Sequence, residues 1–183
     1  MGPQCRMIDS VNVDPIANAV TLRPMPRVFD RKKLKTDCLN CDAMCCTQAA
    51  IEATGYVKPS GVTCKNLDLE TTRCRVFENL ESLGFKWCRG FDCYGAGVAV
   101  TELFRHLGRN WKSDDSIKEI ECHVFAIVYF RLIQYLHPDW PTEIDVPAGR
   151  LRELEPFVEA ALDILAETAD PFKNLESAKE NTT

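Results

Sequence analysis

The sequence has no hydrophobic run long enough to cross a membrane. Its longest apolar stretch, "CHVFAIVYFRLIQYL", is interrupted by Arg131 and Gln134 and falls short of the roughly 20 residues that a membrane-spanning helix needs. It therefore predicts a buried core helix. The first residues, "MGPQCRMIDSVNV", hold one arginine and no apolar run, so no signal peptide is predicted. We expect a cytoplasmic protein that does not associate with membranes.

The sequence also lacks the common catalytic motifs. It contains no phosphate-binding glycine motif, no H-E-x-x-H and no G-x-S-x-G, and it has only 3 histidines. No internal repeat is visible, and strand patterns are almost absent. These absences leave enzymatic activity open but favour a protein that is not an enzyme.

Charge is distributed unevenly along the chain. Residues 1–36 carry seven Lys and Arg against three acids, whereas residues 139–183 carry four against eleven. This pattern predicts an extended basic arm at 1–36 and an acidic helical extension at 138–183. The arm has no aromatic interleaving and no helical basic stripe, so we do not expect it to bind nucleic acid. A protein partner of unknown identity is the better expectation, and the oligomeric state is open.

Helical periodicity begins near residue 95. Apolar residues recur at three- and four-residue steps over 95–107, a longer helix is predicted over 113–137, and a third pattern covers 147–169, where Pro156 is predicted to break or restart the helix. A shorter apolar pattern over 75–84 predicts one more helix. We expect a mainly α fold with little or no sheet, in which an irregular cysteine-rich region packs on three or four helices.

Cysteine is the abundant residue that calls for a chemical explanation. The chain has 10, and eight of them follow the order C-x2-C-x3-C-C-x17-C-x9-C-x13-C-x4-C. In a reducing compartment such a density favours metal binding over disulfides or a catalytic thiol. The sequence therefore predicts a metal-binding domain with core helices at 37–137. Its predicted ligands are Cys38, Cys41, Cys45, Cys46, Cys64, Cys74, Cys88 and Cys93.

The spacing of these thiols favours two metal sites or one bridged cluster. Two intervening residues let a tight turn direct Cys38 and Cys41 at one ion, and a thiophilic ion takes about four thiolates. Adjacent Cys45 and Cys46 cannot easily reach the same ion, because neighbouring side chains diverge. Eight thiolates fit two four-cysteine sites, or one iron–sulfur cluster with four cysteines left over.

Positive charge and a helix start accompany the cysteines. Six basic residues lie within three positions of a predicted ligand, where they either offset thiolate charge or form an ordinary soluble surface. Cys93 stands just before the helix predicted to begin near Gly95, where free N–H groups favour an anion. The six basic residues are Lys35, Lys65, Arg73, Arg75, Lys86 and Arg89.

On "CLNCDAMCC", "CKNL", "RCRVFENL" and "CRGFDC", the chain resembles the YkgJ-type cysteine-cluster family, which is described as a zinc- or iron-chelating domain. It is more similar still to the cysteine-rich amino-terminal domain of bacterial pentapeptide-repeat proteins, through "KPSGVTCKNL", "LGFKWC", "DCYGAG" and "GRNW". The likeness covers about Asp37 to Leu136. It implies metal chelation by the eight cysteines and a bacterial source. The chain has no pentapeptide repeat, so functions that depend on one do not carry over.

The leading hypothesis is a metal-binding protein with one or two centres in a structural, sensory or partner-binding role. Zinc is the first choice of metal, because closed thiolate-rich sites suit it. An iron or iron–sulfur protein with a redox or accessory catalytic role is the first alternative. The second alternative is a thiol-redox enzyme that uses Cys38 and Cys41, although no thioredoxin-like pattern is visible.

Overall fold

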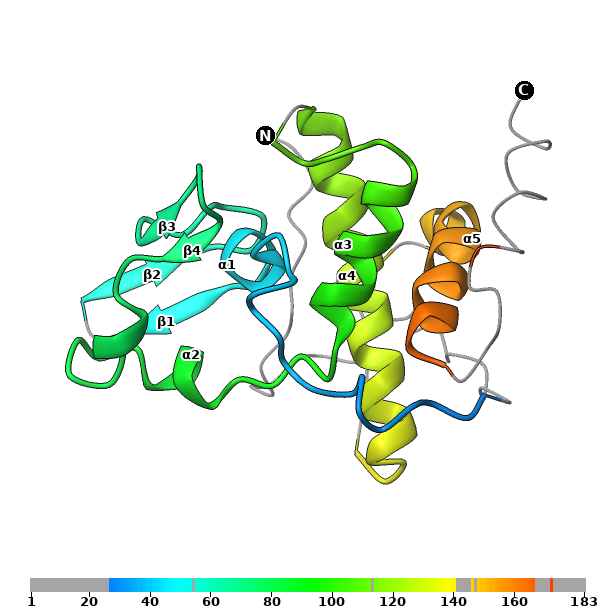
Figure 1. Cartoon of the computed structure of the whole chain (residues 1–183), viewed down its shortest axis with the longest axis horizontal. Helices are drawn as coiled ribbons and strands as arrows, with labels where there is room; N and C mark the ends of the chain where they lie inside the picture. The colour runs from blue at the N-terminus through cyan, green and yellow to red at the C-terminus, as the bar shows by residue number, and fades with distance from the viewer. Residues whose placement is uncertain are drawn as a thin grey trace.

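Three helices pack against one another and carry the hydrophobic core (Figure 1). They are α3 (Ala96–His106), α4 (Asp115–Leu136) and α5 (Ala148–Leu165). The computed structural model describes residues 27–53, 55–112, 114–140, 146, 148–166 and 172. Within them, the predicted mainly α fold is confirmed.

Local sequence explains where α3 and α4 begin. Gly95 adopts the left-handed conformation (φ 83°) directly before α3, a geometry that glycine reaches without steric cost. Asp114 caps α4, because its side chain accepts a hydrogen bond from the backbone N–H of Ser116 at 2.9 Å. The predicted starts of both helices are thus confirmed to within two residues.

The second half of α4 is the centre of the core. Its side chains are buried on almost all sides, as the nearly continuous apolar pattern predicts. The helix lies between α5 and the cysteine-rich half of the chain (Figure 1). Residues of this segment that are fully buried include Val124, Phe125, Ile127, Val128 and Leu132.

The prediction that Pro156 breaks the last helix is wrong. Helix α5 continues through Pro156 to Leu165. Proline removes one backbone hydrogen bond and usually kinks a helix. Buried Leu154 and Val158 lie on either side of the proline and pack into the shared core, so tertiary packing holds both halves in one helix.

The cysteine-rich half consists of short elements. It contains two antiparallel hairpins. Ile51 pairs with Lys58 at the end of the first, and Leu67 pairs with Cys74 at the end of the second. Helix α1 contacts α3 and α4, and α2 contacts the first hairpin. The elements are α1 (Met44–Gln48), β1 (Ile51–Ala53), β2 (Tyr56–Lys58), β3 (Leu67–Asp68), β4 (Arg73–Cys74), the 3-10 helix η1 (Phe77–Asn79) and α2 (Lys86–Gly90).

The helix predicted over 75–84 is largely absent. Only η1 forms there, followed by turns. Leu80 is buried, but Phe77 and Leu83 are exposed, so the segment has no continuous apolar face to bury. A short helix without such a face is marginal, because forming its first turn is costly.

The described part of the basic arm runs along α5. Phe29 forms a bridge with Ala166, and Arg27 pairs with Asp163 at 2.7 Å and with Glu159. Part of the arm's positive charge is therefore paired with acidic side chains of α5. Residues 1–26 lie outside the described residues, so the division into arm, cysteine domain and acidic extension stays a prediction. No helix among the described residues is long and apolar enough to cross a bilayer.

Replacement of Gly95 by alanine is expected to destabilise the fold by about 3 kcal/mol. A Cβ at this position would meet the carbonyl oxygen of Lys33 and the side chain of Leu165, and the positive φ adds about 1 kcal/mol or more. Gly108→Ala is the matched control, because φ is also positive there (67°) and a Cβ would meet nothing. Denaturant unfolding should rank the two variants in that order. Equal losses would contradict the close packing at Gly95.

Candidate metal centre

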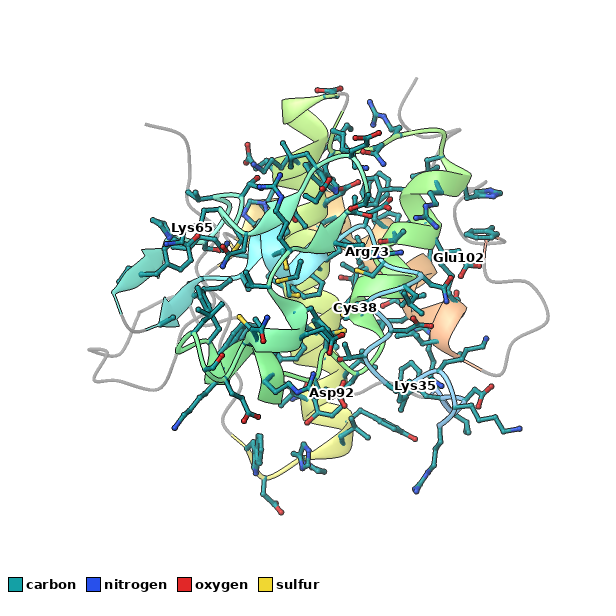
Figure 2. The ribbon with its side chains drawn as sticks, turned by 60° about the vertical axis from the view of Figure 1, so that its left-hand side comes forward. Lys35, Cys38, Lys65, Arg73, Asp92 and Glu102 are labelled. Carbon is teal, nitrogen blue, oxygen red and sulfur yellow. The ribbon has the colours of Figure 1, made fainter. Side chains whose placement is uncertain are left out.

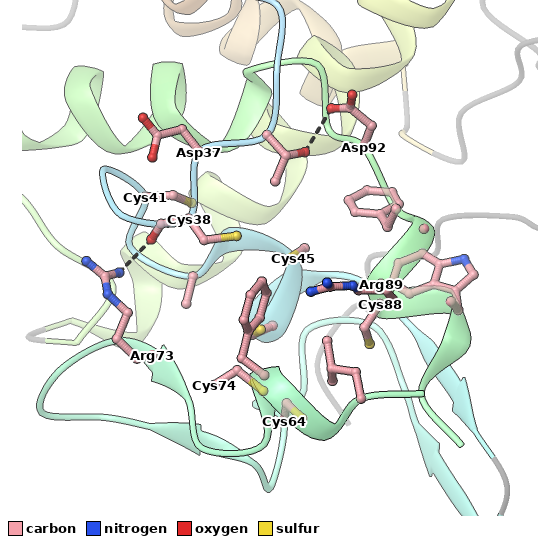
Figure 3. A pocket seen from close by; sticks show the side chains of 18 of the residues that line it. Asp37, Cys38, Cys41, Cys45, Cys64, Arg73, Cys74, Cys88, Arg89 and Asp92 are labelled. Atoms are coloured by element: carbon pink, nitrogen blue, oxygen red, sulfur yellow. Dashed lines mark hydrogen bonds between the residues drawn. The ribbon is translucent and has the colours of Figure 1, made fainter. Parts of the chain in front are cut away.

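Seven of the eight predicted ligands line one cavity of about 910 Å³ (Figure 3). The eighth, Cys93, lines a smaller adjoining cavity of about 40 Å³ together with Cys38, Cys41, Cys45 and Cys88. All eight are free cysteines, so none of them is used in a disulfide. The structure thus brings together thiols that are spread over more than fifty positions of sequence.

Helix α1 and the loop before it carry the first four thiols. Cys38 and Cys41 lie in the turns before the helix, and Cys45 and Cys46 lie within it. Ala43, in the left-handed conformation (φ 59°), reverses the chain between the two pairs. The adjacent thiols interact, since Cys46 raises the pKa of Cys45 and Cys45 lowers the pKa of Cys46.

Cys64 and Cys74 are tied to Cys46 through the backbone. The N–H of Cys64 donates to the carbonyl oxygen of Cys46 at 2.8 Å, and the N–H of Leu67 donates to that of Cys64 at 3.0 Å. Leu67 in turn pairs with Cys74 across the β3–β4 hairpin. Figure 3 shows Cys64 and Cys74 together at one end of the cavity.

The last two thiols lie in α2 and in the segment that joins α2 to α3. Cys88 lies within α2, and Cys93 lies three residues before the first residue of α3. The carbonyl of Cys93 accepts from the N–H of Ala96 at 2.9 Å. The predicted position of Cys93 at a helix start is confirmed.

One of the thiols receives hydrogen bonds of the kind that stabilise thiolates. Cys41 Sγ accepts from the backbone N–H of Met44 at 3.4 Å and from Thr101 Oγ1 at 3.9 Å. Near Cys93, Thr36 Oγ1 accepts from the N–H of Cys93 at 2.9 Å, donates to Asp92 Oδ1 at 2.8 Å and lies 3.6 Å from the Cys93 sulfur. Such outer contacts orient metal ligands and offset their charge.

Burial keeps several of these thiols protonated when no cation is present. It raises the pKa of Cys41 to about 12 and that of Cys88 to about 11, and neighbouring thiols add to both shifts. Burial also raises the pKa of Cys38 and Cys74. Metal ligation requires thiolates, so a bound ion would have to displace these protons, and binding should strengthen as pH rises.

A buried lysine faces the thiols. The side chain of Lys58 is 1% exposed, and its Nζ donates to the carbonyl oxygen of Val62 at 2.6 Å. Burial lowers its pKa to about 8, while Cys64 and Cys46 act in the opposite direction. In the part of the chain that the structure describes, no carboxylate forms an ion pair with it. A buried cation without an anionic partner is costly, so its position favours negative charge on the neighbouring sulfurs.

The predicted basic residues have different roles. Arg73 donates to the carbonyl oxygens of Cys38 and Leu39 at 2.6 Å each, which fixes the loop of the first cysteine pair. Figure 2 shows Cys38 between Arg73 and Asp92. Lys65 lies over the ring of Tyr56, Arg89 lies over that of Phe77, and Arg75 pairs loosely with Asp68. Of the six basic residues, Arg73 contributes most clearly to the site.

Sequence reasoning missed three residues around the thiols. Lys58, Thr36 and Thr101 were not among the predicted site residues. Lys58 is the first residue of "KPSGVTCKNL", so the quoted resemblance contained a signal for it. Gly97 lies on α3, where a Cβ would come within 2.8 Å of Cys41 Sγ. The two threonines carry no pattern that marks them.

The thiols surround the cavity, but their present positions do not form a coordination site for an ion. No group of three or more Cys, His, Asp or Glu among the described residues has metal-binding geometry. A cavity of about 910 Å³ is much larger than one ion. The donor chemistry nevertheless fits a thiophilic metal, since eight reduced cysteines line two adjoining cavities. Binding would require the thiols to move toward one another.

Comparisons with known proteins give limited information. No family model matches the chain, and no solved structure matches it. The chain is similar to the uncharacterized protein YybG of Bacillus subtilis (strain 168), with 26% identity over 119 residues, which is 62% of this chain and 42% of the relative. The chain thus spans less than half the length of that relative.

Proposed function

We propose that this chain is a metal-binding protein that holds its metal through eight cysteines. The observation that carries the proposal is the convergence of all eight reduced thiols on two adjoining cavities. Thiolates prefer soft or borderline ions. The proposed ligands are Cys38, Cys41, Cys45, Cys46, Cys64, Cys74, Cys88 and Cys93.

Zinc is the proposed metal, in a structural, sensory or partner-binding role. A zinc site with four thiolates is closed and leaves no position for substrate. The hydrogen bonds to Cys41 and the buried cation Lys58 would offset its net negative charge. These features support holding an ion in place more than exposing it to a substrate.

An iron–sulfur protein is the alternative that the cavity size supports. A cluster of iron and sulfide occupies more space than one ion and also takes cysteine ligands. A thiol-redox enzyme built on Cys38 and Cys41 has less support. Burial raises the pKa of both thiols, whereas a reactive cysteine needs a lowered one. The described strands form only antiparallel hairpins, not the βαβ unit of thioredoxin-like proteins.

Anaerobic purification followed by elemental analysis and a visible spectrum tests the proposal. A colourless protein with stoichiometric zinc is the expected result. Brown protein with broad visible absorption would establish the iron–sulfur alternative. A protein that lacks stoichiometric metal of either kind would rule out both. The proposal that all eight cysteines bind metal would also be wrong if replacing Cys64 or Cys74 left metal content and folding intact.

Gly97→Ala is expected to weaken metal binding by about 10- to 100-fold without unfolding the protein. The new Cβ would come within 2.8 Å of Cys41 Sγ and displace that ligand. Alanine also favours helix, so α3 itself should not suffer. Competition with a chelating dye measures the affinity. Gly90→Ala, where a Cβ would meet nothing within 4 Å, is the matched control. Unchanged affinity in Gly97→Ala would remove Cys41 from the ligand set.

A further inference from the structure

The eight thiols divide into two sets of four. The first set surrounds the smaller cavity, and the second set is linked through the backbone around the β3–β4 hairpin. The first set is Cys38, Cys41, Cys45 and Cys93. The second set is Cys46, Cys64, Cys74 and Cys88.

The first set gathers at the start of α3. All four of its thiols line the cavity of about 40 Å³, which Cys88 also lines. Gly97 lies between two of them, because a Cβ there would be 2.8 Å from Cys41 Sγ and 3.7 Å from Cys93 Sγ. Cys41 interacts electrostatically with Cys93 and Cys38, whereas Cys45 interacts first with Cys46 and then with Cys41 and Cys93. The four sulfurs are neighbours around the smaller cavity, and Cys38 and Cys45 also interact with Cys46 of the second set.

The second set gathers on the hairpin side of the large cavity. The backbone bond from Cys64 to Cys46 and the pairing of Leu67 with Cys74 hold three of its members together. Cys88 interacts electrostatically with Cys46, Cys64 and Cys74, and Cys74 interacts with Cys46 and Cys64. Cys93 does not line this larger cavity.

The surroundings of the two sets also differ. The backbone N–H of Met44 and the hydroxyl of Thr101 approach Cys41 in the first set. Near the second set, the Nζ of buried Lys58 donates to the carbonyl oxygen of Val62, two residues before Cys64. A buried lysine at this place favours negative charge on the nearby thiols.

We propose that the chain holds two separate four-cysteine metal centres, one on each set, which meet at the adjacent residues Cys45 and Cys46. Each centre binds one zinc ion through four thiolates. The first centre is stabilised by hydrogen bonds and the second by Lys58. This inference rests on the proposed function, because it assigns the ligands of the same site.

Ligand removal tests the division. The full-length chain should bind two zinc ions, Cys38→Ala should bind about one, and Cys74→Ala should bind about one. The variant with both Cys74→Ala and Cys88→Ala should still bind about one ion, because both residues belong to the second set. The variant with both Cys38→Ala and Cys74→Ala should bind none. Ser82→Ala, on an exposed turn outside both cavities, is the control and should bind two.

Thiol protection gives a second readout that identifies the sets directly. In zinc-loaded Cys74→Ala, iodoacetamide should modify Cys46, Cys64 and Cys88 and leave the first set protected. Circular dichroism confirms that the helices remain folded. Modification of all seven remaining cluster cysteines in a folded variant would overturn the division and indicate a single shared cluster. Equal metal loss in the two double variants would overturn it as well.

The two proposals fail in different ways. If the full-length chain binds no metal, the proposed function fails and the two centres fail with it. If it binds metal but single replacements in either set release all of it, only the division fails.

Discussion

Removal of the proposed zinc by a chelator is expected to unfold residues 37–93 and to leave α3, α4 and α5 folded. A structural zinc ion contributes about 10 kcal/mol or more to folding, which is comparable to the whole stability of a typical domain. The cysteine-rich half has helices of only five residues and hairpins of two or three residue pairs. It contains little that could keep it folded without the metal.

The three longer helices contribute most of the apolar core, which Met44, Ile51 and Leu67 of the cysteine-rich half also join. Phe104, Phe125, Leu132, Val158 and Leu162 are buried helix residues of this cluster. Burial of such side chains contributes about 2 kcal/mol each. This core should therefore survive metal loss.

Hydrogen exchange followed by mass spectrometry measures this effect region by region. After chelation, residues 37–93 should exchange like an unfolded chain, while α4 stays protected. Chelator already saturated with zinc is the control and should change nothing. If protection of residues 37–93 is unaffected by metal removal, the metal does not hold this half together.

Glu121→Gln is expected to stabilise the protein by about 3 kcal/mol at pH 9 and to change little at pH 5. Burial raises the pKa of Glu121 from 4.5 to about 8, and nearby Asp42 adds to the shift. One carboxylate oxygen of Glu121 is buried without a hydrogen-bond partner in the described structure. The folded protein therefore favours the protonated carboxyl.

The direction in which stability changes with pH follows from the raised pKa of Glu121. A raised pKa gives a stabilising contribution that is complete below pH 4.5 and is lost as pH rises through about 8. Glutamine keeps the shape of the neutral carboxyl and does not titrate. The wild type should lose stability as pH rises from 4.5 to about 8. The Glu121→Gln variant should not show this loss, because the glutamine stays neutral.

Denaturant unfolding at pH 5 and pH 9 measures the difference between the two proteins. Glu102→Gln removes an exposed carboxylate from α3 (Figure 2) and is the matched control, expected to change stability little at either pH. If Glu121→Gln is destabilising at pH 9, the carboxylate is needed in its charged form and the explanation is wrong.

The sequence predicted the helical half well, because its signals are local. Gly95, Asp114 and the apolar steps of α3 and α4 lie within the elements they define. The errors occurred where tertiary contacts decide the outcome. Pro156 is accommodated because both halves of α5 pack on the same core. Residues 75–84 form turns because they present no continuous apolar face, since Phe77 and Leu83 are exposed.

The cysteine pattern indicated which residues come together but not how they are grouped. Cys93 lies far from Cys38 in sequence, and only the start of α3 brings it to Cys41. Lys58 was missed because it is not within three residues of a cysteine, although the β1–β2 hairpin places it beside Cys46 and Cys64. Such neighbours depend on hairpin pairing, which single-sequence patterns do not reveal.

Native mass spectrometry of the 183-residue chain counts the bound ions directly. With both centres filled, the native mass should exceed the mass of the acid-denatured chain by two zinc ions, less the protons that the bound thiolates have lost. Identical native and denatured masses, with all eight cluster thiols reactive toward iodoacetamide in the folded protein, would contradict it.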